Sequence, residues 1–227
     1  MNTTYNYEKD TLKHPFSGHT KVFENYSQAY QDLFVLSMLK GKKNGKYVEV
    51  GANHPQSMSN TFLLETVFGW RGFSIEIEKS MCEVFNGDMA RQNHCYEADG
   101  TAFDYETAIK KEKWQGRIDY LSLDCEPPHI TFDVLKKFPL DEYRCSVITF
   151  EHDAYKDGFG IMDASRKYLT EKGYVLVCSS VCNGANPYED WWIDPYVVKE
   201  ETYKPFECMG SEAVSYTHLT LPTILLV

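Results

Sequence analysis

The sequence lacks three features that would assign its function at once. It contains no GxGxxG run, no CxxC pair and no apolar stretch long enough to cross a membrane. The first is the dinucleotide-binding fingerprint, the second is typical of zinc and redox sites, and the third marks a spanning helix. The N-terminus is polar and has no apolar core of a signal peptide. The sequence therefore predicts a cytoplasmic protein with no membrane span.

Positive charge is also scarce. There are 23 lysines and arginines against 33 aspartates and glutamates, for a formal net charge of -10. Nucleic acids and anionic membranes are not attracted to an acidic surface, so we expect no nucleic-acid partner. The seven cysteines are odd in number and scattered, which indicates reduced thiols and no structural metal site.

Along the 227 residues, apolar side chains recur either at helical spacing or in short runs typical of strands. Helical spacing alternates with short β-favouring runs through five units, and two further strands follow close together. We predict an α/β fold with a mostly parallel, twisted sheet, helices on both faces and an antiparallel edge hairpin. The expected strands are 46–50, 71–78, 94–99, 118–124, 145–150 and 174–181, with a last strand near 189–194.

Composition divides the chain into three parts. Residues 1–25 are polar and aromatic, and we interpret them as an N-terminal extension of a domain that covers 26–212. Residues 213–227 are interpreted as a non-native tail, because 214–227 contain no charged side chain and resemble translated sequencing-adapter read-through. A genuine apolar tail is the alternative.

The segment 46–60 has the pattern of a strand, a glycine turn and a helix start. A buried strand that includes Glu49 meets Gly51 and Asn53, and a helix pattern begins near Asn60 and Thr61. Strand, glycine turn and helix start form the first crossover of nucleotide-binding sheets, although one glycine also suits an ordinary turn.

Two acids follow later strands. Glu76 lies 25 residues beyond Gly51, where dinucleotide folds place a carboxylate for ribose hydroxyls. Asp99 ends the third strand and could bind an adenine amino group. Alternatively, Glu76 is a solvated carboxylate at a strand end, and Asp99 is a turn residue before Gly100.

Short motifs occur in order over residues 26–195, and together they resemble the FkbM family of S-adenosylmethionine-dependent methyltransferases. They are Ser27-Gln28, Gln31-Asp32, Val48-Glu49-Val50-Gly51-Ala52-Asn53, Ser59-Asn60-Thr61, Leu64-Glu65, Gly69-Trp70-Arg71-Gly72, Ile75-Glu76, Asp119-Tyr120-Leu121-Ser122-Leu123-Asp124, Glu126, Glu151-His152, Gly173-Tyr174 and Glu189-Asp190-Trp191-Trp192. The chain departs from the family at Pro127, where a glycine is usual, and at His54-Pro55, where an acid and a glycine are frequent.

The resemblance implies a Rossmann-like class I methyltransferase that uses S-adenosylmethionine. Gly51 would then let the backbone approach the amino-acid end of the cofactor, and Glu49 would take its ammonium group. Polar groups near the helix start would hold the carboxylate, and the two later acids would bind the nucleoside. The polar groups that would hold the carboxylate are Asn53, Asn60 and Thr61. Glu76 would bind the ribose, and Asp99 would bind the adenine.

Methyl transfer to a hydroxyl requires positioning and removal of a proton. The candidates follow the fourth and fifth strands: His152 as general base, or Asp124 with Glu126. Alternatively, Asp124, Glu126 and Glu151 hold Mg²⁺, or these acids only cap helices. Trp191 and Trp192 form either a pocket wall or hairpin packing.

The family favours a hydroxyl of a sugar, glycan or related small metabolite as the acceptor. Two other functions stay open. Pro127 motivates a non-catalytic binding module, and the ribose acid suits an NAD-dependent enzyme, which the missing GxGxxG argues against.

Overall fold

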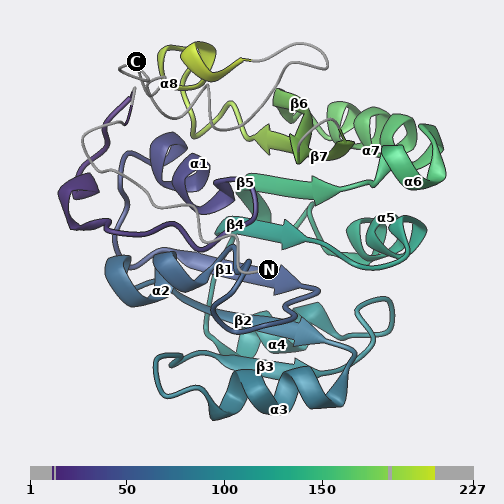
Figure 1. The fold of residues 1–227 in the computed structure, drawn as a ribbon. Helices are drawn as coiled ribbons and strands as arrows, with labels where there is room; N and C mark the ends of the chain where they lie inside the picture. The colour runs from purple at the N-terminus through teal and green to yellow at the C-terminus, as the bar shows by residue number, and fades with distance from the viewer. Residues whose placement is uncertain (1–11, 13, 184–185, 208–227) are drawn as a thin grey trace, which may run out of the picture.

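The computed structural model describes residues 12, 14–183 and 186–207 and is built around one seven-stranded sheet (Figure 1). The strand order is β3-β2-β1-β4-β5-β7-β6. Strands β1 to β5 pair in parallel, whereas β7 runs antiparallel to both β5 and β6. The predicted parallel sheet with an antiparallel edge hairpin is confirmed. The strands are β1 Lys46–Val50, β2 Arg71–Glu76, β3 His94–Glu97, β4 Arg117–Leu123, β5 Arg144–Glu151, β6 Val175–Asn183 and β7 Asn186–Ile193.

Helices lie on both sides of this sheet (Figure 1). They are α1 Gln31–Met38, α2 Phe62–Phe68, α3 Lys79–Gly87, α4 Tyr105–Lys111, α5 Pro128–Lys137, α6 Ala154–Asp157, α7 Gly160–Glu171 and α8 Glu200–Tyr203, with short 3₁₀ turns at His19–Lys21 and Lys204–Phe206. None of these helices is both long and apolar enough to cross a lipid bilayer.

Strand β1 shows how the sequence creates two cores. Successive side chains of a strand point to opposite faces. Tyr47 accordingly packs with α1 and α2, whereas Val48 and Val50 pack with α4 and α5. Glu49 has the same parity as Tyr47, so its carboxylate is buried on the α2 side.

The structure describes only part of the two terminal segments that were predicted to lie outside the domain. Within the described part of residues 1–25, Phe16 and Val22 are buried in the core around α1 and α2. The predicted tail at 213–227 lies outside the described residues. The boundary between extension and domain therefore stays a prediction.

The structure corrects some local expectations. Helix α3 buries Cys82 and Phe85, whereas Val84 is 49% exposed. Met89 follows the end of α3 and is 99% exposed. The short helices α6 and α8 were not predicted, because four residues do not display a helical period.

The sheet order determines where a ligand can bind. The chain runs outward from β1 to β3 and then returns to β4 on the other side of β1. In parallel α/β sheets, ligands bind at the carboxyl ends of the strands beside such a reversal. The ends of β1 and β4 therefore mark the candidate site.

Candidate active site

The turn after β1 is held against the end of β4. Gly51 has φ +84°, and a Cβ there would lie 1.6 Å from the backbone oxygen of Asp124. The amides of Gly51 and Ala52 both donate to the carbonyl of Ile75 at the end of β2. Only glycine fits this close, left-handed turn. It brings three strand ends together.

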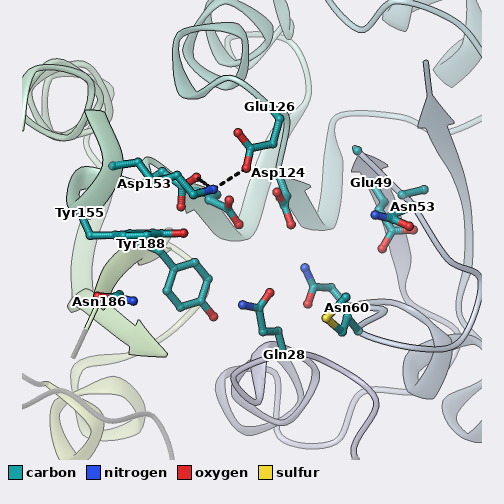
Figure 2. A pocket seen from close by; sticks show the side chains of 15 residues that line it. Gln28, Glu49, Asn53, Asn60, Asp124, Glu126, Asp153, Tyr155, Asn186 and Tyr188 are labelled. Carbon is teal, nitrogen blue, oxygen red and sulfur yellow. Dashed lines mark hydrogen bonds and ion pairs between the residues drawn. The ribbon is translucent and has the colours of Figure 1, made fainter. Parts of the chain in front are cut away.

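Two adjoining cavities open at these strand ends. The larger has a volume of about 510 Å³ and lies over β2, β3 and β4, and the smaller has about 280 Å³ and lies between β1, β4, β5 and β7. Both cavities are lined by Gly51, Asn53, Asp124 and Glu126. Figure 2 shows the smaller cavity with side chains from these separate elements converging on it. A ligand could therefore extend from one cavity into the other.

The larger cavity contains the two predicted nucleoside acids. Glu76 accepts one hydrogen bond from the Asn53 amide and one from the Glu78 amide, both at 2.8 Å. Asp99 is exposed at the rim, and hydrogen bonds from Thr101 lower the pKa of its carboxyl group. Each carboxylate oxygen has further accepting capacity, so both acids can still bind a ligand donor.

Glu49 belongs to a buried ionic network below the smaller cavity. Its Oε2 accepts hydrogen bonds from Ser74 Oγ at 2.7 Å and Thr61 Oγ1 at 2.9 Å. Arg91 Nη2 lies 3.6 Å from the same oxygen, and Nη1 lies 3.2 Å from Glu65 Oε2. Burial raises the pKa of Glu49, and the positive charge of Arg91 opposes this rise. The carboxylate therefore already has a cation.

Thr61 lies apart from the other residues predicted to contact the cofactor. Its side chain is fully buried and lines neither cavity. The hydroxyl donates to Glu49 and accepts from Arg91 Nη2 at 2.9 Å. It therefore stabilises the network and faces away from a ligand.

Asn60 does line the smaller cavity. Its Nδ2 donates to Ser122 Oγ at 3.0 Å. Its Oδ1 is buried and has no hydrogen-bond partner among the described residues. The available atom is an acceptor, which suits a ligand donor better than the cofactor carboxylate predicted for this residue.

Four carboxyl groups form the wall on the β4 and β5 side: Asp124, Glu126, Glu151 and Asp153. Burial is the main cause that raises the pKa of Asp124 to about 6 and that of Glu151 to about 11. Both pKa values are raised, so the hydrogen-bonded pair keeps a shared proton near neutral pH. The pair holds one proton and one negative charge.

Lys156 neutralises the outer half of this wall. Its Nζ lies 2.7 Å from Glu126 Oε1 and 2.6 Å from Asp153 Oδ2, as Figure 2 shows for the first contact. The carboxylate oxygens of Glu126, Glu151 and Asp153 lie within 4.8 Å of one another. This set differs from the predicted metal ligands, since Asp153 takes the place of Asp124. The ammonium group of Lys156 already bonds two of these three residues, Glu126 and Asp153.

The structure places His152 away from both cavities, which does not favour its predicted role as general base. The imidazole is fully buried and lines neither cavity. Its Nδ1 accepts a hydrogen bond from the Ala154 amide at 3.2 Å, and Nε2 lies 3.5 Å from Asp190 Oδ1. Asp190 is in turn bonded by Arg166. The side chain therefore faces the core behind β5.

The sequence interpretation missed several lining residues. Tyr155 and Lys156 come from α6, which was not predicted, and Asn186 and Tyr188 come from β7. The sequence did contain one signal for them: Asp153 and Lys156 lie three residues apart directly after a strand, a spacing that suits an ion pair on a short helix. Trp191 and Trp192 are about 1% exposed and line neither cavity, so hairpin packing is the correct alternative.

Comparison with known proteins gives structural matches only. No family model matches the chain, and no curated protein matches its sequence. The methyltransferase domain of METTL16 (crystal form 2) superposes with a TM-score of 0.52 at 14% identity, covering 80% of this chain and 73% of that one. Fibrillarin from Aeropyrum pernix with natively bound S-adenosyl-L-methionine gives 0.50 at 12% identity, covering 75% and 78%. With its strand order, the chain has the Rossmann-like fold of class I methyltransferases.

Proposed function

We propose that this protein is an S-adenosylmethionine-dependent methyltransferase that acts on a hydroxyl of a sugar, glycan or related small metabolite. The joined cavities at the β1–β4 reversal carry the proposal, because one presents a ribose-type acid and the other a proton-accepting pair. The sequence resemblance to the FkbM family supports the hydroxyl acceptor. The fold of the chain agrees with the cofactor.

The larger cavity fits the nucleoside part of the cofactor. Its volume falls within the roughly 300–1,000 Å³ of small-molecule sites. Glu76 would accept the ribose hydroxyls, Asp99 would face the adenine edge, and Ile77 and Ile130 offer apolar surface for the base. Gly51 and Asn53 line both cavities, and the amino-acid end would lie against them at the junction.

Asp124 is the group that we assign as general base. When bound, S-adenosylmethionine supplies an electrophilic methyl group, so the chain itself must orient the acceptor and remove a proton. Asp124 borders both cavities, and its pKa of about 6 lets the carboxylate accept a proton near neutral pH. Glu151 holds Asp124 in place through their hydrogen bond.

We do not assign Mg²⁺ to the acidic wall, because Lys156 already bonds Glu126 and Asp153. Glu126 then positions Lys156 and contributes to the rim of the site. Glu49 is assigned to the ionic network under the cofactor, where Arg91 balances its charge.

The experiment is a screen of hydroxylated acceptors for release of S-adenosylhomocysteine from S-adenosylmethionine. We expect turnover with at least one acceptor and a loss of about 10²–10⁴-fold for Asp124→Asn. Asp133→Asn, on the exposed side of α5, is the matched control and should keep full activity. Cofactor binding without turnover on any acceptor would instead support a non-catalytic binding module.

A further inference from the structure

Two carboxyl groups in the inner part of the smaller cavity have no cationic partner among the described residues. Asp124 and Glu151 form one wall, and neither makes an ion pair within 4 Å among the described residues. The other carboxylates that line the cavity have cations: Arg91 for Glu49, and Lys156 for the rim. One negative charge on the inner pair is therefore left for a ligand.

Asn60 is an independent indication of a ligand donor. The residue is 7% exposed, and its Oδ1 is buried without a hydrogen-bond partner in the described part of the chain. Figure 2 shows its amide across the cavity from Asp124. Buried acceptors are satisfied in most folded proteins, so an empty one that lines a cavity points to a donor supplied from outside.

At the rim of the same cavity, the side-chain ammonium group of Lys156 bonds two carboxylates. Lys156 Nζ bonds Glu126 and Asp153 at 2.7 and 2.6 Å. Asp153 holds its carboxylate there from a left-handed backbone conformation with φ 44°. An ammonium group has three donors and no acceptor, which matches this acceptor-rich lining.

The remaining lining limits the size and shape of the ligand. A volume of about 280 Å³ restricts the cavity to a small ligand. Gln28, Asn186 and Tyr188 offer polar groups for hydroxyls, and Tyr155 offers an aromatic surface that is 43% exposed. These features favour a hydroxylated ring over an extended apolar chain.

We propose, resting on the methyl-transfer function above, that the acceptor is a small hydroxylated primary amine of the amino-sugar class. Its ammonium group binds between Asn60 Oδ1 and the carboxyl pair of Asp124 and Glu151. The same binding places a neighbouring hydroxyl beside Asp124, which accepts its proton. The amine thus provides recognition and positions the hydroxyl.

The test compares D-glucosamine with D-glucose on the full chain saturated with S-adenosylhomocysteine. Saturation-transfer NMR detects millimolar binding and suits these small probes. We expect glucosamine to bind at least about tenfold more tightly than glucose, which is about 1.4 kcal/mol. N-acetylglucosamine, which lacks the charge, should behave like glucose. The preference for glucosamine should weaken with added salt.

Variants locate the binding group. Asp124→Asn with Glu151→Gln removes the charge and preserves the shapes, and should abolish the preference for glucosamine. Glu112→Gln, an exposed carboxylate on the far end of α4, should retain it. If the double variant does not fold, the comparison of glucosamine with glucose on the wild type decides alone.

Three outcomes would overturn the inference. The first is equal binding of glucosamine and glucose, and the second is no binding of either sugar. The third is tight binding of Mg²⁺ alone that Glu151→Gln removes, which would make the wall a metal site. Failure of S-adenosylhomocysteine itself to bind, measured by calorimetry before the sugars are added, would instead refute the proposed function.

Discussion

Asp124, which follows β4, is hydrogen-bonded to Glu151 at the end of β5, and the two carboxyl groups share a proton. Both side chains are partly buried, which raises their pKa values, and the negative charges of neighbouring acids further favour the shared proton. Neither residue alone would show this behaviour in an exposed strand end. The pair explains why one carboxylate can remain charged in an acidic cavity while its neighbour stays neutral.

This relationship predicts how stability depends on pH. The folded state keeps the Glu151 proton above the pH at which the unfolded chain loses it, so the folded state binds more protons and stability falls as pH rises from about 5. Glu151→Gln keeps a neutral donor and removes this dependence. We expect it to stabilise the protein by about 1–3 kcal/mol at pH 8, with a smaller gain at pH 5. Urea unfolding at both pH values measures the difference, and a gain that grows towards low pH would contradict the shared proton.

His152 should matter for stability and not for proton transfer. His152→Gln disturbs the buried contacts with Ala154 and Asp190, and we expect a loss of about 1–3 kcal/mol in urea unfolding. The pH profile of methyl transfer should keep its shape, because Asp124 supplies the base. His129→Gln, an exposed histidine on α5, is the control for both measurements. Loss of the acidic limb in the His152 variant alone would restore the general-base hypothesis.

Arg91 should be the most costly buried charge to remove. Arg91→Met leaves Glu49 and Glu65 buried without their cation, and we expect destabilisation by about 3–5 kcal/mol. Adding Glu49→Gln should recover part of this loss, because the amide can still accept from Thr61 and Ser74 without carrying a charge. Denaturant midpoints of the single and double variants give the coupling. Strictly additive effects would mean that Arg91 and Glu49 do not interact.

Gly51 should tolerate no side chain. Gly51→Ala places a methyl group against the Asp124 carbonyl in a left-handed turn, and we expect a loss of more than about 2 kcal/mol. Gly116 also has a positive φ, but nothing lies within 4 Å of its position, so Gly116→Ala should cost only about 1 kcal/mol. Thermal unfolding compares the two. Equal losses would show that the contact with Asp124 contributes nothing.

The sequence predicts the framework of this site because periodicity and turn chemistry are local. Gly51 marks the first crossover, and the acids after β4 and β5 meet because parallel strand ends share one edge. The orientation of single side chains beyond those ends is not local. The amides of His152 and Asp153 both bond the carbonyl of Tyr188 on β7, and this contact turns the histidine inward.

Thr61 illustrates the same limit. It follows a polar helix start and looked suited to a ligand, but Arg91 reaches back from 30 residues further along the chain to bond its hydroxyl. Asn60, one position earlier, keeps an acceptor in the cavity. Neighbouring residues thus divide between core and site according to long-range contacts that no short pattern encodes.

We propose that the larger cavity binds the methyl donor through Glu76. Calorimetric titration of S-adenosylhomocysteine into the full chain tests it most directly, with Glu76→Ala compared against Glu97→Ala, an exposed acid that lines neither cavity. We predict micromolar binding that Glu76→Ala weakens by about 1–3 kcal/mol and Glu97→Ala leaves unchanged. No binding, or equal binding by all three proteins, would contradict the assignment of this cavity to the cofactor.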